Sequence, residues 1–411
     1  EQFAYGNQDF SGDKGKNNAL TRAWMSGSSL LISPREQTVF LQKVVDHKLP
    51  VNEKSYQMTK NIFFVDELTN GWKLYGKTGT GNVPLTDGTL DPEREGGWFV
   101  GWIEKDERKL VFASYLEQTK QDLPAGGKAK EIAKQRLTSL IQLEKARQAA
   151  RNIPLLSGQQ LDLSAISGGL TNRIYLVKTN NGQRYVLRVF GEEASSLGIN
   201  PVQQAKIALQ TGNINVSPKV VYLSDDNKLM LVEFASGKPL ARESYTNRIR
   251  RELTEKLRRL HDFGDFSSNF DPFKTSAEFR RIALNKPAAT ISLFPVADMD
   301  RAYALMQQIQ MAIHTHSKKF MRSCHNDLHR ENILVDSNNS TVQIIDLDYA
   351  GFSDLFFDLA ILANSLDLSA NEALQLLTGY FTPRLPTARD IASDVRKAMT
   401  TARRWCSHWL G

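Results

Sequence analysis

Two short polar segments, each next to a strand-like apolar run, constrain the second half of this 411-residue chain most strongly. They are CHNDLHRENILVD at 324–336 and VQIIDLDYAG at 342–351. Asn332 follows Asp327 by five residues, and Asp346 comes fourteen residues after Asn332. Carboxylate and amide oxygens are ligands that Mg²⁺ prefers in proteins. The spacing therefore predicts two neighbouring loops that share a carboxylate base and a magnesium site.

Phosphoryl transfer needs these residue types. A carboxylate orients the attacking hydroxyl and accepts its proton, and oxygen ligands hold Mg²⁺ on the triphosphate. Asp327 is the candidate catalytic base, and the candidate metal ligands are Asn332, Asp346 and Asp348. The order Asp-x4-Asn and then Asp matches the spacing of kinase catalytic and metal loops. The alternative, two exposed hairpins that carry these residues by chance, is disfavoured because His325 also falls in place.

The composition indicates a globular chain of more than one domain. Hydrophobic residues make up 41% and charged residues 24% of a chain longer than one ordinary domain. The sequence contains no run of 18 or more apolar residues, so no membrane span is predicted. The net charge of +7 suits anionic ligands such as nucleotides, and equally a solvated basic surface. The first residues, EQFAYGNQDF, have no leader pattern and resemble the interior of a domain, so we expect a fragment of a longer protein.

A basic helical segment divides the chain. Residues 128–151 have helical period and carry seven Lys or Arg against two Glu. A solvated helix that joins two domains is favoured over a nucleic-acid-binding helix, so no nucleic-acid partner is expected. NIPLLSGQQ then ends the helix. We expect one domain at 1–142, a linker at 143–154 and a second domain at 155–411.

The part before this helix predicts a capped helix and a β-hairpin. In SPREQTVFLQKVVDHKL, Ser33 is the expected cap, Pro34 the first helical residue and Glu36 the partner of a capping box. GWFVGWIEKD and KLVFASYLEQ are apolar and aromatic runs separated by charged turn residues. They predict an antiparallel hairpin.

Beyond the linker the pattern changes to a small β-rich lobe and a larger helical lobe. SGGLTNRIYLVKTNNGQRYVLRVFG predicts a hairpin at Asn-Gly, PVQQAKIALQTG a helix, and PKVVYLSDDNKLMLVEF another strand pair. From residue 246 onward the pattern is mostly helical, and His261 in LRRLHDFG is expected to be structural rather than catalytic. This α+β layout is that of a bilobal, kinase-like domain.

The segments HNDLHRENIL and IDLDYAGFSDLFFDLA resemble the choline/ethanolamine kinase family, which shares its fold with aminoglycoside phosphotransferases and thiamine kinase. The resemblance covers about 152–411. It implies a phosphotransferase that uses ATP and Mg²⁺ in the cytoplasm. GGLTNRIYLV is similar to the nucleotide loop, and YVLRVFG to a third strand that carries Arg188 where many kinases have Lys. The implied ATP-binding residues of that loop are Ser167, Gly168 and Gly169.

Other positions bear on how the nucleotide and the acceptor are held. Glu233, in the connecting segment LVEFASG, is a further implied ATP-binding residue. The kinase helix after the third strand normally offers a Glu to the basic residue, whereas Gln204 stands at the matching position and would hold Arg188 less firmly. Trp405 and Trp409 are placed like the tryptophans of choline kinases, and would bind a small cationic acceptor through their aromatic faces. Core or surface packing of these two tryptophans is the alternative.

The first part of the chain resembles the C-terminal portion of a class D β-lactamase. Its matching motifs are Tyr-Gly-Asn (Tyr5, Gly6 and Asn7), an active-site-loop Trp (Trp24), Lys-Thr-Gly (Lys77, Thr78 and Gly79) and Trp-x-x-Gly (Trp98 and Gly101). That family's mechanism requires a Ser-x-x-Lys element well upstream of Tyr-Gly-Asn. A string of this form, Ser11 to Lys14, follows Tyr-Gly-Asn and is expected to be a loop. We expect an incomplete half-domain with uncovered sheet edges and apolar surface, and no β-lactam hydrolysis by this chain alone.

Three functions stay open from the sequence. The first is an ATP-dependent phosphotransferase that acts on the hydroxyl of a choline, ethanolamine or thiamine type of acceptor, joined to a non-catalytic β-lactamase remnant. The second is a fragment of a penicillin-binding class D β-lactamase fusion whose Ser-x-x-Lys lies upstream, periplasmic if a leader precedes it. The third is an inactive fusion relic that binds nucleotide. The sequence does not fix the acceptor or the oligomeric state.

Overall fold

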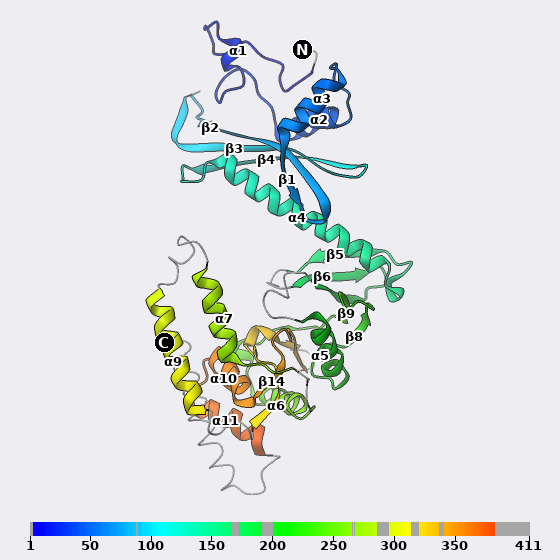
Figure 1. Ribbon diagram of the computed structural model, residues 1–411, viewed down its shortest axis with the longest axis vertical. Coiled ribbons are helices and arrows are strands. Elements are labelled where there is room, and N and C mark those ends of the chain that lie inside the picture. Colours follow the sequence, from blue (N-terminus) through cyan, green and yellow to red (C-terminus); the bar gives the residue numbers. More distant parts are fainter. Residues whose placement is uncertain are drawn as a thin grey trace. The chain divides into compact units, whose positions relative to one another are not determined.

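The computed structural model describes residues 3–87, 89–166, 172–190, 200–264, 266, 268–285, 296–313, 320–336 and 341–382. It divides the chain into two compact units, residues 1–148 and 149–411, which are drawn together in Figure 1. In the described ranges, no helix is both long enough and apolar enough to cross a lipid bilayer.

The boundary between the units falls within helix α4 (Ala125–Arg151). The helix confirms the predicted helical segment at 128–151. Most of the proposed linker at 143–154 is therefore helical, and a short 3-10 helix, Pro154–Leu156, follows it. The domain limits proposed from the sequence stay a prediction.

The first unit is a four-stranded antiparallel sheet with strand order β1-β2-β3-β4. Its elements are α1 (Ala19–Arg22), α2 (Pro34–Val45), α3 (Glu53–Phe63), β1 (Phe64–Leu68), β2 (Trp72–Pro84), β3 (Leu90–Lys105), β4 (Arg108–Thr119) and α4. Strands β3 and β4 form the predicted hairpin. Helix α2 begins as predicted, because Ser33 Oγ accepts from the Glu36 N–H and the Glu36 carboxylate accepts from the Ser33 N–H.

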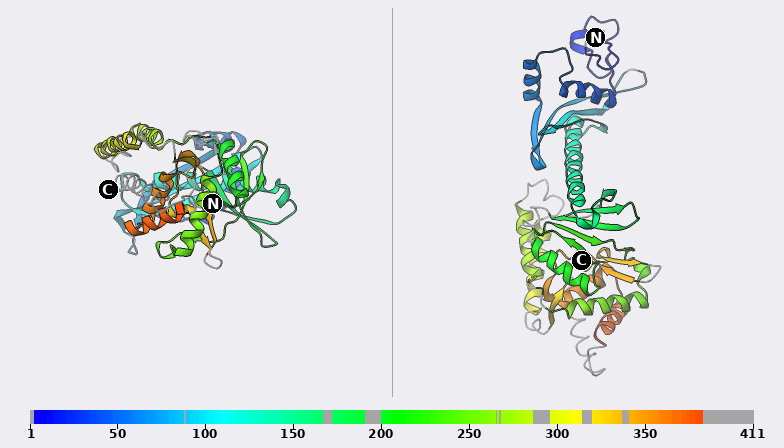
Figure 2. Two further views of the ribbon diagram at one scale, coloured as in Figure 1. Left: turned by 90° about the horizontal axis from the view of Figure 1, so that it is seen from below. Right: turned by 90° about the vertical axis from the view of Figure 1, so that its right-hand side faces the viewer.

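Helices cover both faces of this sheet. Leu74 and Ile103 are fully buried against Ala129 of α4, which lies along one face (Figures 1 and 2). Tyr75 and Trp102, the neighbouring strand residues, stack on each other with centroids 5.0 Å apart beside α2. Successive side chains of a strand point to opposite faces, so the two clusters lie on the two sides of the sheet.

Apolar surface in the first unit is left uncovered, as the half-domain interpretation predicts. Trp24, Leu31, Met58, Ile62 and Phe64 each expose more than half of their surface. Among the described strands, β4 pairs with β3 alone, so the other edge of β4 has no strand beside it. An unpaired strand edge and exposed apolar side chains are both surfaces on which further chain can pack.

The second unit confirms the predicted bilobal α+β layout. Its sheets have the strand orders β5-β6-β7-β9-β8, β10-β12-β13 and β11-β14. The elements are β5 (Leu161–Ala165), β6 (Asn172–Thr179), β7 (Arg184–Phe190), α5 (Pro201–Asn213), β8 (Val220–Leu223), β9 (Leu229–Glu233), β10 (Lys238–Pro239), α6 (Asn247–His261), α7 (Pro272–Leu284), α9 (Val296–Ile313), β11 (Met321–Cys324), β12 (Ile333–Asp336), β13 (Thr341–Ile344), β14 (Gly351–Asp354), α10 (Leu355–Ser365) and α11 (Ala370–Phe381).

The small lobe contains the two predicted strand pairs, β6–β7 and β8–β9, and the predicted helix α5. The side chain of Asn200 caps α5 by accepting from the Val202 N–H. On the sheet side, Ala208 of α5 packs against Phe190 and Met230. This packing holds α5 against the strand that carries Arg188.

The large lobe is built around one apolar core. Leu253, Leu257 and Leu260 lie on one face of α6 and are fully buried, as their spacing predicts. They share the core with Ile333 of β12 and Ile344 of β13. Helices α7 and α9 lie side by side (Figures 1 and 2). The core fixes β12 and β13, and the loops next to these strands carry the site.

Candidate active site

Two loops of the large lobe meet at the site because their strands are neighbours. Ile333 of β12 pairs with Ile344 of β13. Next to this pair, the Ile345 N–H donates to the main-chain oxygen of Asn332 at 2.9 Å. The buried ring of His325 adds a second link, since its Nε2 lies 2.8 Å from the main-chain oxygen of Ile345. The predicted catalytic and metal loops are therefore adjacent.

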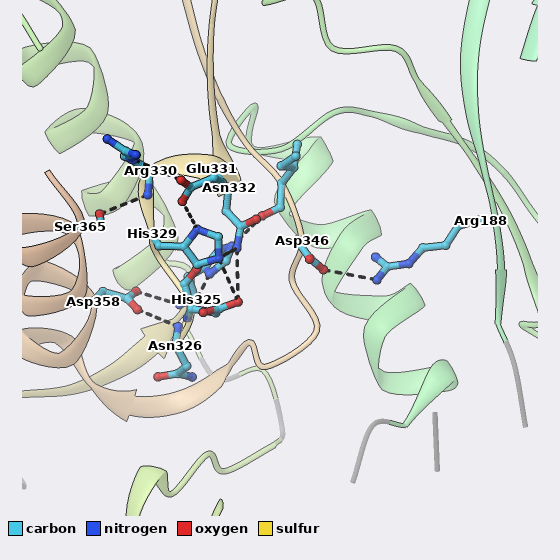
Figure 3. A network of polar contacts seen from close by, with 12 residues as sticks. Arg188, His325, Asn326, His329, Arg330, Glu331, Asn332, Asp346, Asp358 and Ser365 are labelled. Atoms are coloured by element: carbon cyan, nitrogen blue, oxygen red, sulfur yellow. Dashed lines mark hydrogen bonds and ion pairs between the residues drawn. The ribbon is translucent and has the colours of Figure 1, made fainter. Parts of the chain in front are cut away.

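A buried carboxylate holds the start of the catalytic loop. Asp358 of α10 is fully buried, and it accepts the N–H groups of His325 at 2.8 Å and Asn326 at 2.7 Å. His261 Nε2 lies 3.1 Å from the same carboxylate (Figure 3 shows the two main-chain contacts). Burial raises the pKa of Asp358, but the contacts with His261 and His325 outweigh it and bring the pKa below its usual value. His261 thus has the structural place that its sequence context predicts.

Asp327 presents its carboxylate at the end of this loop. The Asn332 amide donates to the main-chain oxygen of Asp327 at 2.9 Å and to its Oδ2 at 3.3 Å, while His329 Nε2 lies 3.6 Å from Oδ2. Burial is the largest effect on the pKa of Asp327 and raises it above the ordinary value. A carboxylate with a raised pKa is a better proton acceptor than an exposed one. The geometry agrees with a general base at this position.

The three candidate metal ligands gather beside Asp327. Hydrogen bonds from the Asn332 amide nitrogen orient that side chain and leave its oxygen as the ligand atom. Asp346 follows β13 with φ of 62°, a left-handed conformation that aspartate adopts more readily than most non-glycine residues. Burial raises the pKa of Asp346, and the neighbouring Asp348 carboxylate raises it further. Two crowded carboxylates and an amide oxygen are a donor set that suits Mg²⁺.

A cation of the protein itself lies on these carboxylates. Arg188 of β7 forms ion pairs with Asp346, at 3.5 Å, and with Asp348 (Figure 3 shows the pair with Asp346). The Arg188 side chain is only 13% exposed. Its place shows that the two carboxylates accept a positive charge between them, which is the requirement for a metal site.

Within the described part of the chain, Gln204 and Arg188 do not hydrogen-bond to each other. Gln204 Nε2 donates to the main-chain oxygen of Asp348 at 3.3 Å, while its Oε1 is buried and has no partner among the described residues. The position that the kinase pattern gives to Glu therefore lies next to the metal loop. The predicted weaker hold on Arg188 agrees with the guanidinium turning to Asp346 and Asp348.

Several other predicted residues are not tested by the structure. Glu233 is exposed at the end of β9, opposite Tyr185, and its role in ATP binding stays a prediction. The remaining predicted nucleotide and acceptor residues lie outside the described residues; they are Ser167, Gly168, Gly169, Trp405 and Trp409.

A cavity of about 410 Å³ opens beside the catalytic loop, and Asp327 and His329 are part of its wall. Four aromatic rings form much of the rest; they belong to Phe270, Phe279, Tyr349 and Phe357. Ring centroids of Phe270 lie 6.0 Å from Tyr349 and 6.1 Å from Phe357. The cavity thus places a mostly apolar, aromatic surface next to the candidate base.

The sequence did not predict this aromatic wall. Tyr349 stood inside the quoted metal loop and Phe357 inside the following helix, but nothing in their spacing indicated a shared cavity with Phe270 and Phe279 of the α7 region. Tyr349 lies close enough to the site for its carboxylates to affect it. Burial raises the pKa of Tyr349 most, and the carboxylates of Asp327, Asp348 and Asp346 raise it further.

In the first unit, the β-lactamase-like residues lie on separate surface segments. Tyr5 OH donates to Gln37 of α2 at 2.6 Å, and Asn7 Nδ2 donates to the main-chain oxygen of Ser29 at 2.9 Å. Trp24 is 60% exposed. The serine of the Ser-x-x-Lys string, Ser11, lies in an exposed loop, as predicted.

Lys77, Thr78 and Gly79 lie on β2, where they pair with β3. Strand β1 reaches only as far as Tyr75, so this part of β2 has no strand on its other side among the described residues. The Lys77 ammonium is exposed and donates to the Thr78 oxygen at 2.7 Å. A strand edge with a neighbouring cation is a surface that suits a carboxylate group.

Comparison with known proteins assigns both units. Residues 162–391 match the phosphotransferase enzyme family, which is more than half of the chain. The chain belongs to this family. Residues 1–138 match the transpeptidase domain of penicillin-binding proteins. The predicted join of a class D β-lactamase-like portion to a phosphotransferase domain is confirmed.

The curated relatives of the first unit include beta-lactamases and the regulatory protein BlaR1 of Bacillus licheniformis. Beta-lactamase OXA-9 of Klebsiella pneumoniae is 46% identical over 132 residues, which are 32% of this chain and 48% of that protein. Beta-lactamase OXA-1 of Escherichia coli is 47% identical over 117 residues, 28% of this chain and 40% of that protein. The chain therefore spans about half the length of the curated relatives it matches.

For the phosphotransferase domain, a solved structure shows the fold. The choline kinase LicA from Streptococcus pneumoniae is 18% identical, with a TM-score of 0.50, and the match covers 65% of this chain and 94% of LicA. Family members generally use ATP and Mg²⁺, which agrees with the donor set at Asn332, Asp346 and Asp348. The family match does not fix the acceptor.

Proposed function

We propose that the phosphotransferase domain transfers the γ-phosphoryl group of ATP to the hydroxyl of a small cationic metabolite of the choline, ethanolamine or thiamine type. One observation carries the proposal: the aromatic cavity opens directly at Asp327, beside the metal-ligand group. Because ATP is the phosphoryl donor, a cytoplasmic location is part of the proposal.

In this mechanism Asp327 orients the acceptor hydroxyl and takes its proton at a carboxylate oxygen. Asn332 holds that carboxylate in place, and its amide oxygen, with Asp346 and Asp348, would hold Mg²⁺. The metal supplies charge neutralisation on the phosphate oxygens. Arg188 is the candidate to bind phosphate through two N–H groups at once, which a lysine cannot do in the same planar geometry.

The character of the cavity supports the acceptor class. Aromatic faces attract quaternary ammonium groups and stack on heteroaromatic rings. Among the described lining residues, Asp327 supplies the carboxylate of the wall. An aminoglycoside carries several ammonium groups that need several carboxylates, so this wall favours a monocation with an apolar body.

An ATP-consumption assay with choline, ethanolamine, thiamine and an aminoglycoside tests the proposal. Asp327→Asn should lower turnover by at least ~10²-fold with nearly unchanged nucleotide binding, since general-base assistance contributes about 10²–10⁴-fold. Asp346→Ala should weaken Mg-ATP binding as well, because it removes a charged ligand. Near wild-type phosphorylation by Asp327→Asn would reject the assignment of this loop. Binding of ATP with no turnover on any acceptor would favour the inactive relic.

A second candidate function is favoured by the first unit. Two uncovered features, the unpaired edge of β4 and the free side of β2 at Lys77, lie at opposite edges of the sheet. Together with the exposed apolar residues, they support a unit that receives the missing half of a class D β-lactamase domain. Completed in this way, the unit would bind β-lactams. The nucleophile would come from the added half, because Ser-x-x-Lys is absent from the family's position in this chain.

Fragment complementation tests the second candidate. The chain alone should not hydrolyse a chromogenic cephalosporin. Mixed with the Ser-x-x-Lys-containing half of beta-lactamase OXA-9, it should form a complex in gel filtration and gain hydrolysis that Lys77→Ala abolishes. Failure of the two proteins to associate would reject this function, and saturable hydrolysis by the unmixed chain would show that the nucleophile lies within it.

A further inference from the structure

We propose that Arg188 and Gln204 form a two-position switch that keeps the magnesium ligands occupied until a nucleotide binds, with Gln204 as the positioning residue. This inference rests on the proposed phosphotransferase function. It concerns the order in which metal and nucleotide enter, which the assignment of base and ligands does not address.

In the first position the guanidinium neutralises the metal ligands. Arg188 pairs with both Asp346 and Asp348, and it is largely shielded from water. Opposite charges attract more strongly in such a site than at the surface. A divalent cation that binds the same oxygens must displace the guanidinium. The chain without nucleotide should therefore bind Mg²⁺ weakly.

Two unsatisfied atoms point to the second position. Arg188 Nε is buried without a hydrogen-bond partner, and so is Gln204 Oε1, within the described part of the chain. The first is a donor and the second an acceptor. Both side chains already reach Asp348, one at its carboxylate and the other at its main-chain oxygen. A native structure seldom leaves such groups unpaired, and a bond between these two would satisfy both at once.

The Gln204 side chain lies beside open space. Gln204 and Asp348 both line a cavity of about 720 Å³ between α5 and α7. The cavity gives the Gln204 side chain space to change its rotamer, which is the movement that the second position requires. Arg188 projects from β7, the central strand of the small-lobe sheet, and its guanidinium carbon lies 5.5 Å from the ring centroid of Phe190.

The amide at Gln204 decides which position is favoured. A carboxylate there would form a charge-assisted bond and hold the guanidinium on α5 at all times. The neutral amide attracts it less than the pair Asp346 and Asp348 does, so the first position prevails without nucleotide. Phosphate oxygens then shift the balance, because they accept from the guanidinium and release both carboxylates. Nucleotide and metal consequently bind with positive coupling.

Binding of Mn²⁺ to the full-length chain, followed by electron paramagnetic resonance, tests the switch. Wild-type protein should bind Mn²⁺ at least about tenfold more tightly with a non-hydrolysable ATP analogue than without it. Gln204→Glu should tighten Mn²⁺ binding without nucleotide by about tenfold, the effect of one charge-assisted bond. The coupling to the analogue should shrink by the same factor.

Gln203→Glu is the matched control. It adds the same charge one residue earlier on α5, where the Gln203 side chain donates to the main-chain oxygen of Phe266 instead. It should leave Mn²⁺ binding within about twofold of wild type. Equal effects of the two substitutions would show a general electrostatic influence and overturn the switch, as would unchanged Mn²⁺ binding in Gln204→Glu.

A second variant covers the case in which Gln204→Glu does not fold. Arg188→Met removes the guanidinium, so Mn²⁺ binding without nucleotide should tighten by about tenfold or more. Unchanged or weaker binding would overturn the proposal. Nucleotide affinity, measured separately by fluorescence, distinguishes failure of the proposed function from failure of the switch. If the wild-type chain binds no nucleotide, the proposed function is rejected. The comparison of Mn²⁺ binding without nucleotide then still decides on the switch.

Discussion

Replacing Asp358 by Asn should loosen the catalytic loop and lower the stability of the phosphotransferase domain. The carboxylate is fully buried, and its Oδ2 receives the His325 N–H and faces His261 Nε2. Its Oδ1 receives the Asn326 N–H. An amide keeps one acceptor oxygen but turns an NH₂ group towards two of these partners. The new NH₂ group and the His325 main-chain N–H are both donors and cannot bond to each other. The buried N–H of His325 is therefore left unsatisfied.

The size of the effect follows from these contacts. One lost hydrogen bond to a charged group, with an unsatisfied buried donor, costs about 3 kcal/mol. This is a large part of the roughly 5–15 kcal/mol that stabilises a domain. At roughly 2–4 °C per kcal/mol for a domain of this size, the melting temperature should fall by about 6–12 °C.

Scanning calorimetry of the full-length chain measures the loss, because the transition that rises on addition of nucleotide reports the phosphotransferase domain. Asp367→Asn is the matched control. It removes the same charge just after α10, at an exposed position, and should change the unfolding free energy by no more than about 0.5 kcal/mol. If Asp358→Asn melts within 2 °C of wild type, the buried carboxylate does not hold the loop and the reasoning fails.

Three further outcomes are expected. Burial raises the pKa of Asp354 to about 6, so the folded protein binds more protons than the unfolded chain between about pH 4 and 6. The contribution of this group to the unfolding free energy is present below about pH 4 and is lost as the pH rises through 6. Asp354→Asn keeps the cap on the Phe356 N–H and should raise the melting temperature at pH 7.5 but not at pH 4; equal shifts at both would contradict this. Because the pKa of Asp327 is raised, the acid-side fall of kcat/KM should begin at a pH above the usual pKa range of aspartate. A fall that occurs only within the usual range would argue against Asp327 as the base. A chain of residues 149–411 should fold and bind Mg-ATP by itself, whereas an unfolded product by circular dichroism would assign part of the first unit to the kinase core.

The local parts of the site could be predicted from the sequence. Asp327, Asn332 and Asp346 lie on two loops joined to neighbouring strands, so their spacing along the chain fixes their closeness once β12 and β13 pair. The capping box at Ser33 and the hairpin of β3 and β4 were predictable for the same reason. In each case the partners lie within one helix turn or one pair of consecutive strands, and local hydrogen bonds decide the geometry.

Only the tertiary structure decided which distant side chains meet at these loops. Arg188 reaches Asp348 across 160 residues, and Asp358 reaches the catalytic loop from the following helix. The aromatic cavity draws Phe270 and Phe357 from two different segments. Such contacts depend on how helices and sheets pack around the apolar core. Contacts between distant segments leave no regular pattern of residues in the sequence from which they could be predicted. The sequence therefore determined the chemistry of the site, while the packing of the two lobes decided which charges and rings surround it.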